Sequence, residues 1–164
     1  MTSSLKKRAI QPPYERFDGG GEADVRIKEF SFVRTKEGVS AWTLKATQAE
    51  LFERRQKTFL ENITAKIPYG DGHYLRIEGD SGEVDSEKDD FALWKKNGQI
   101  AIELENNYVV KTSGVRWDES QRTILSQGPV RISGPQTEIE GNAFKILVDN
   151  QEMVVVGDVK ALVN

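Results

Sequence analysis

The sequence predicts an all-β fold, an antiparallel sandwich or jelly roll, and three observations support this prediction. Apolar and polar residues alternate with the two-residue period of a β-strand, so that Ile100, Ile102 and Leu104 share one face. Turn signals such as Gly128-Pro129 separate the short strands at the spacing typical of sandwiches. A block of about thirty residues recurs four times, as in proteins built from stacked supersecondary units.

Two anchor positions define this repeat. The first is a small residue, and its four copies are separated by 33, 32 and 29 positions: Ala49, Gly82, Gly114 and Ala143. The second is a turn followed by an apolar alternation, at Asn62-Ile63, Gly98-Gln99-Ile100, Gly128-Pro129-Val130 and Gly157-Asp158-Val159. A unit of this size cannot bury its apolar face alone, so the copies must stack. Overall shape, and not a catalytic cluster, is therefore expected to carry the function.

The chain length and the composition of its start predict one domain preceded by an arm. The 164 residues suit a single domain. Residues 1–22 contain Pro12-Pro13 and three consecutive glycines with few apolar residues, which predicts a flexible N-terminal arm, and residues 23–164 are predicted to form the β domain. No apolar run approaches the roughly twenty residues that a membrane-spanning helix needs.

The first predicted strand changes phase along its length. Val25 and Ile27 alternate in one phase and Phe30 and Phe32 in the other, which predicts a β-bulge near Lys28-Glu29. Gly38 is expected to close the following hairpin at positive φ, leading into a strand that carries Trp42, Leu44 and Ala46 on one face.

Residues 45–57 carry two conflicting signals. They are rich in helix formers, and intrinsic propensity favours a helix. The repeat favours a strand, a turn and a strand, because the corresponding segments 112–124 and 141–153 show β-branched and aromatic alternation around a charged turn. We favour the strand interpretation, with the helix as the alternative.

Composition excludes several classes of function. The formal net charge is −3, with 23 basic and 26 acidic residues scattered along the strands, so nucleic acid is not an expected partner. There is no cysteine, which removes disulfides and thiolate chemistry, and His73 is the only histidine. His73 is expected to be an exposed turn residue. We therefore predict no metal site and no cofactor.

Paired carboxylates raise the alternative of a carbohydrate-active enzyme. The pairs that suggest it are Asp89/Asp90, Glu103/Glu105 and Glu138/Glu140, because a glycosidase needs two carboxyl groups flanking a cleft. Solvated strand faces are the favoured interpretation, since Glu103 alternates with apolar neighbours. Packing is likewise favoured over sugar stacking for Trp42, Trp94 and Trp117. No catalytic residue is predicted.

A large apolar interior is what remains, and a sandwich whose sheets stay slightly apart presents a slot suited to acyl chains. In the order and spacing of its motifs the chain resembles the LptC family over about residues 25–162. The matching motifs are Phe30-Ser31-Phe32, Gly38 to Ala46 with Trp42-Thr43-Leu44, the Gly79 to Val84 block, Tyr108 to Trp117-Asp118, Ser126-Gln127-Gly128-Pro129-Val130 and Gly157-Asp158-Val159-Lys160-Ala161.

The resemblance implies a twisted, open β-jelly roll of antiparallel strands built from OstA-like repeats. It also implies a non-enzymatic periplasmic carrier that receives lipopolysaccharide from an inner-membrane ABC transporter of the LptB2FG type and passes it to an LptA-like relay protein. Members of the family carry one N-terminal transmembrane helix. This sequence departs from that pattern by lacking the helix, which we expect if it is the soluble part of an anchored protein. The alternatives are an LptA-like relay protein and a purely structural β-repeat module that binds no lipid.

Two sets of site residues follow from this resemblance and from strand alternation. Acyl chains of lipid A are expected to contact inward-facing residues, namely Leu44, Ala46, Ile100, Ile102, Leu104, Val130, Ile132, Phe144 and Ile146. Partners are expected to contact both ends of the repeat stack, namely at Gly38 for the transporter and at Val154, Val156, Val159 and Ala161 for edge-to-edge pairing with the LptA-like protein.

Overall fold

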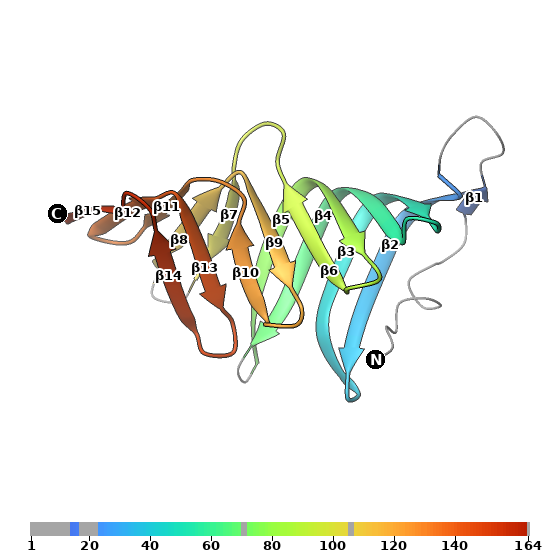
Figure 1. Cartoon of the computed structure of the whole chain (residues 1–164), viewed down its shortest axis with the longest axis horizontal. Coiled ribbons are helices and arrows are strands. Elements are labelled where there is room, and N and C mark those ends of the chain that lie inside the picture. The colour runs from blue at the N-terminus through green and yellow to red at the C-terminus, as the bar shows by residue number, and fades with distance from the viewer. Residues whose placement is uncertain (1–13, 17–22, 70–71, 105–106, 164) are drawn as a thin grey trace.

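The structure, a computed structural model, describes residues 14–16, 23–69, 72–104 and 107–163, and these form two antiparallel sheets (Figure 1). The larger sheet has ten strands in the order β1 (Tyr14–Arg16), β2 (Val25–Lys36), β3 (Val39–Phe52), β4 (Lys57–Tyr69), β5 (His73–Asp85), β6 (Asp90–Trp94), β9 (Gly114–Asp118), β10 (Thr123–Ser126), β13 (Ala143–Leu147) and β14 (Glu152–Val156). The smaller has five, in the order β15 (Lys160–Val163), β12 (Thr137–Gly141), β11 (Val130–Ser133), β8 (Val109–Thr112) and β7 (Ile100–Glu103).

The all-β prediction is confirmed, and the two sheets do not close on each other, as in a twisted open jelly roll. The strand interpretation of residues 45–57 is also confirmed, because β3 runs to Phe52 and β4 starts at Lys57. Pairing of the buried Ala49 with the buried Leu60 shows why. Burial of one strand face outweighs an intrinsic helix preference of a few tenths of a kcal/mol per residue.

The strands β2 to β5 are long and change phase at one common row. On β2 the buried positions shift from Val25 and Ile27 to Phe30 and Phe32, and on β4 they shift from Leu60 to Ile63. The ladder pairs on either side place Glu29, Thr47, Asn62 and Asp80 opposite one another. Glu29 and Asn62 have φ of 59° and 53°. We call this row the fold line, because both halves of each strand keep their apolar face toward the same interior.

The predicted irregularity lies where it was expected, but it is not a β-bulge. The phase does change at Lys28-Glu29, but Lys28 pairs with Gln48 and Phe30 with Ala46, so neither strand has an extra residue. The ladder of paired residues leaves out one residue from each strand at the same row. In a β-bulge, two residues of one strand lie opposite a single residue of the other. The register shift that does occur lies further on, between Arg34 and Thr35.

The fold line divides the molecule into two layers. Layer 1 contains residues 25–28, 48–52, 57–61 and 81–85 of the long strands and continues into β6, β9, β10, β13 and β14. Layer 2 contains residues 30–36, 39–46, 63–69 and 73–79 and continues into the five-stranded sheet, where β5 contacts β7. The chain therefore adds hairpins alternately to layer 1 and layer 2. The apolar side chains of the two layers meet in the interior between them, which we call the groove.

Both anchors of the repeat lie at the fold line. The residues that open the second anchor all have positive φ, and they are Asn62, Gly98, Gly128 and Gly157. The small residues of the first anchor start the layer 1 segments, and at Gly82 an added Cβ would lie 2.7 Å from Leu93 Cδ2 and 2.8 Å from the Ala92 carbonyl oxygen. The repeat thus marks where each chain segment turns from one layer into the other and where neighbouring strands pack too closely for a side chain.

The start of the chain adds one short edge strand. Within the segment predicted as an arm, Tyr14–Arg16 form β1 and pair with Val25–Ile27 of β2. The remaining residues of 1–22 lie outside the described part of the chain, so the arm stays a prediction. Over the described ranges, the structure contains no helix long and apolar enough to span a bilayer.

The C-terminal strands end both layers. β14 pairs with β13 at the edge of the larger sheet, whereas β15 pairs with β12 at the edge of the smaller one. β14 and β15 therefore do not pair with each other, because Gly157, at φ of 83°, turns the chain from layer 1 into layer 2. β1 and β15 lie at opposite ends of the long axis in Figure 1.

Candidate functional site: the groove between the layers

The groove is lined by the apolar face of every repeat. Eight of the nine residues predicted to face acyl chains are buried there: Leu44, Ala46, Ile100, Ile102, Val130, Ile132, Phe144 and Ile146. The ninth, Leu104, is partly buried and packs against the same core. Strand alternation thus placed these side chains correctly between the layers, and their contact with a lipid stays a prediction.

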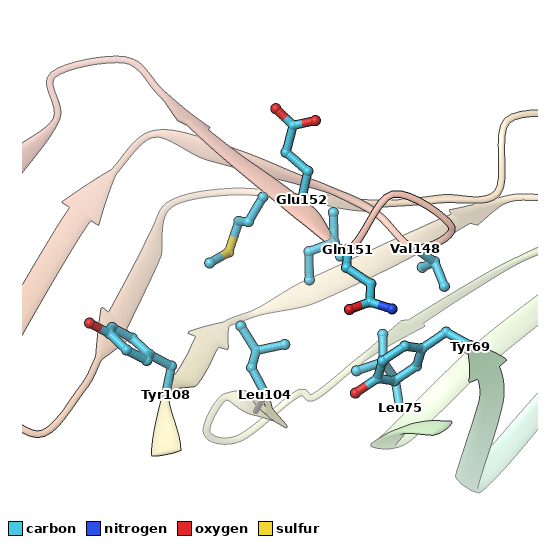
Figure 2. A pocket seen from close by; sticks show the side chains of 9 residues that line it. Tyr69, Leu75, Leu104, Tyr108, Val148, Gln151 and Glu152 are labelled. Atoms are coloured by element: carbon cyan, nitrogen blue, oxygen red, sulfur yellow. The ribbon is translucent and has the colours of Figure 1, made fainter. Parts of the chain in front are cut away.

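A cavity of about 310 Å³ opens from the groove toward its C-terminal end (Figure 2). One wall comes from layer 2, where Tyr69 and Leu75 lie near the tips of β4 and β5 and Leu104 and Tyr108 flank the β7–β8 connection. The opposite wall comes from the β13–β14 hairpin of layer 1, with Ile146, Val148, Gln151, Glu152 and Met153. The exposed Gln151 and Glu152 stand at the rim, and the inner lining is apolar apart from the tyrosine hydroxyls.

Only Leu104 and Ile146 of the predicted set line this cavity. The wall residues that sequence reasoning did not assign include Tyr69, Tyr108 and Met153. Alternation along β14 places Met153 and Val155 inward, so Met153 could have been found from its strand. The same holds for the two tyrosines, because Tyr69 continues the buried series Ile63, Ala65 and Ile67 of β4, and Tyr108 is in phase with the buried Val110 of β8.

The N-terminal half of the groove is filled by aromatic rings. Phe32 stacks on Trp42 at 5.0 Å, Trp42 packs against Phe91 at 4.8 Å, and Phe91 lies 6.3 Å from Trp117. All four side chains are at most 2% exposed. The packing prediction for Trp42 and Trp117 is therefore confirmed.

A buried charged cluster lies beside these rings and joins the layer tips. Arg34 of β2 pairs with Asp89 (Nε to Oδ2, 3.1 Å) and approaches Glu119 (Nη2 to Oε2, 3.9 Å). The Nε1 groups of Trp42 and Trp117 both donate to Glu119 Oε1, at 2.8 and 2.9 Å. Arg34, Asp89 and Glu119 are only 7–8% exposed. We call Arg34, Asp89 and Glu119 the lip cluster.

Arg122 makes a second connection between the layers. It lies in the β9–β10 turn of layer 1, and its guanidinium donates to the carbonyl oxygens of Ala41 (3.4 Å) and Pro68 (3.2 Å) in layer 2. It also lies over the Trp117 ring and pairs with Asp149. The tips of the two layers are therefore fastened together along the N-terminal half, and the cavity lies between the tips beyond the Arg122 contacts.

One of the carboxylates predicted to be solvated is buried. Asp89 does not lie on a solvated face, because its turn folds inward against Arg34. Neither Asp89 nor Glu119 lines the cavity, and both already contact cationic or N–H groups. Within the described ranges, no three His, Cys, Asp or Glu side chains gather as metal ligands.

Asp90, next to the lip cluster, has a perturbed pKa. Burial raises the pKa of its carboxyl above the ordinary value, and the neighbouring Asp118 adds to this, while the hydrogen bond from the Glu119 N–H opposes it. That bond is 2.9 Å long and ties the turn after β9 to the start of β6.

The predicted partner residues lie at the two ends of the molecule. Gly38, at φ of 79°, closes the β2–β3 hairpin as predicted. Val154 and Val156 lie exposed on β14, Val159 lies exposed in the turn before β15, and Ala161 lies exposed on β15. Leu162 and Val163 add to this apolar end, with 61% and 70% of their surface exposed.

Comparison with known proteins identifies the family. Residues 20–164 match the family model described as lipopolysaccharide-assembly, LptC-related. No curated protein matches the chain. Among solved structures the chain is similar to LptH, the LptA homologous periplasmic component of the conserved lipopolysaccharide transport device from Pseudomonas aeruginosa, with a TM-score of 0.56 and 10% identity over 75% of this chain and 94% of that one. At this identity the likeness concerns the fold, while the family model covers most of the chain. This protein therefore belongs to the LptC-related family of lipopolysaccharide-assembly proteins.

Proposed function

We propose that this protein is a non-enzymatic periplasmic carrier that holds the acyl chains of lipopolysaccharide between its two layers. The observation that supports the proposal most is the apolar groove with a cavity of about 310 Å³ at its open end. Acyl chains would leave water for a surface of aliphatic and aromatic side chains, at about 25 cal/mol per Å² of apolar area removed from water. The phosphates and sugars of the lipid would remain outside, beyond Gln151 and Glu152.

The direction of transfer follows from the two ends of the repeat stack. We place the inner-membrane LptB2FG-type transporter at the N-terminal end, near the β2–β3 hairpin with Gly38, and the LptA-like protein at the C-terminal end. Both β14 and β15 are edge strands, and an edge strand offers backbone donors and acceptors to a partner strand. A like-folded partner that extended both layers would continue the groove. An N-terminal membrane anchor is part of the same proposal.

Photo-cross-linking from two neighbouring positions tests the carrier role. Ile102 is fully buried in the groove, and Glu103 is the next residue on the exposed face of β7. A photoreactive residue in place of Ile102 should capture lipopolysaccharide, and one in place of Glu103 should not. Equal capture from both positions, in protein shown to be folded, would rule out an interior groove and favour a structural module.

Separate removal of the two edges tests the exit. Deleting residues 158–164 removes β15 and leaves β14 in place, so it takes away only the layer 2 edge. We expect this variant to lose most of its affinity for the LptA-like protein while the transporter still binds. Unchanged affinity for the LptA-like protein would show that β15 is not part of the docking edge.

A further inference from the structure

We propose that the lip cluster, with Arg122 beside it, is a latch that holds the N-terminal half of the groove shut and opens when an acyl chain passes. The proposal rests on the proposed carrier function. It differs from that function because it assigns the layer tips different resting states in the two halves: they are closed in the N-terminal half and parted around a cavity in the C-terminal half.

The contacts of the cluster cross from one layer tip to the other. Arg34 belongs to β2 in layer 2, whereas Asp89 and Glu119 lie in turns of layer 1. The indole of Trp42, also in layer 2, donates to Glu119. The hairpin turns after β2, β9 and β13 lie along the lower margin in Figure 1, opposite the fold line. These contacts therefore close the groove on the side where the layers are not joined by continuous strands.

The closed half leaves no room for a lipid in its present state. The rings of Phe32, Trp42, Phe91 and Trp117 fill the space next to the cluster and are at most 2% exposed. Beyond Arg122 the tips part, and the cavity begins between Leu75 and Val148. An acyl chain that entered at the N-terminal end would have to separate these rings, which the contacts of the lip cluster hold together.

The chemistry of the cluster suits a contact that opens repeatedly. If the contact between the layer tips were apolar, opening it would expose hydrocarbon to water and lose the whole free energy of its burial. A buried ion pair adds little net stability compared with apolar packing, because its members lose their hydration, and they regain it when the pair separates. Arg34, Asp89 and Glu119 are each more than 90% buried in the closed state. The charged side chains of the lip cluster therefore align the tips of the two layers and lower the free-energy cost of separating them.

One substitution weakens the latch with little other change. Asp89 has φ of 60°, a conformation that asparagine tolerates well, so Asp89→Asn keeps the backbone and the side-chain size while removing the charge that faces Arg34. Arg34 then retains Glu119 as its counter-charge. The variant is expected to fold, and thermal unfolding checks that it does.

Distances between pairs of spin labels test the latch. The natural chain has no cysteine, so labels attach only at introduced positions. Lys36→Cys with Glu87→Cys spans the closed lips, and Tyr74→Cys with Asn150→Cys spans the open half; all four positions are exposed. In lipid-free protein, Asp89→Asn should broaden the 36–87 distance distribution at least twofold and leave the 74–150 distribution unchanged. An unchanged 36–87 distribution would overturn the latch without reference to any ligand.

Hexa-acylated lipid A in detergent micelles then tests opening in the natural sequence. Saturating lipid A should lengthen the 36–87 distance, and Asp89→Asn should bind lipid A more tightly by several fold because less of the closed state must be disrupted. Binding with an unchanged 36–87 distance would overturn the latch and leave the carrier function intact. Absence of any lipid A binding to either protein would instead contradict the carrier function.

Discussion

The two halves of the groove share one architecture but differ in what lies between the strand tips. Both halves turn on the same fold line, with positive φ at Asn62 in one and at Gly128 in the other. Toward the N-terminus the tips meet through Arg34, Asp89 and Glu119, and toward the C-terminus they part around a cavity of about 310 Å³. The repeat therefore sets the shape of the wall, and a few residues at the tips decide whether the two layers meet there or leave a cavity.

The largest expected difference between the halves is in stability. Trp42→Ala removes a fully buried ring and the donor of a bond to Glu119, and should cost about 3–5 kcal/mol of unfolding free energy. Tyr108→Ala, at the wall of the existing cavity, should cost about 1 kcal/mol. Urea unfolding measures both. Similar losses would show that the two halves are equally packed.

Strand packing at the fold line should be tighter at Gly82 of β5 than at Gly114 of β9. Gly82→Ala would put a Cβ 2.8 Å from a carbonyl oxygen of the neighbouring strand, and such overpacking costs about 1–3 kcal/mol. Gly114→Ala would meet Gln127 Oε1 at 3.0 Å, Trp94 Cβ at 3.1 Å and the Leu93 carbonyl oxygen at 3.2 Å, all longer than the contacts at Gly82, so it should cost less. If Gly114→Ala is the more destabilising of the two in urea, neighbouring strands pack more closely at Gly114 than the structure has them.

The smallest effect is expected at Asp90, near the lips. Because burial raises its pKa in the folded state, ionisation of Asp90 opposes folding: this penalty is absent below the unfolded-state value of 3.8 and grows as pH rises above it. Asp90→Asn keeps an acceptor for the Glu119 N–H, so it should be slightly more stable than the natural protein at pH 7 and no more stable at pH 3. Thermal unfolding at the two pH values checks this, and a variant that is less stable at pH 7 would contradict it.

The sequence predicted the wall of the groove better than its lips. Alternation placed Ile102 and Ile132 inward because a strand has only two faces and one of them must be buried. The sequence predicts a solvated strand face for Asp89, as for the other paired carboxylates, whereas its burial depends on Arg34, 55 positions earlier in the chain. The bulge at Lys28-Glu29 was predicted from one strand alone, whereas its true form needs the partner strand.

Strand pairing at the C-terminus shows the same limit. The alternation in residues 152–163 is that of two strands in succession, and it does not state which neighbours they pair with. The positive φ at Gly157 and the bonds from the Asn142 N–H to the carbonyl oxygens of Val156 and Gly157 direct β15 to layer 2. Such contacts join residues of two repeats, so a pattern within one repeat does not contain them.

The most direct test of the account is the affinity for lipopolysaccharide of two neighbouring variants on β14. Met153 lines the cavity, whereas Val154 is 37% exposed on the outer face. Met153→Asp places an unpaired charge where acyl chains are proposed to lie, and should weaken binding by about tenfold or more, which is about 1.4 kcal/mol. Val154→Asp should bind like the natural protein. If both folded variants lose affinity equally, or if Met153→Asp loses none, the lipid does not lie between the two layers.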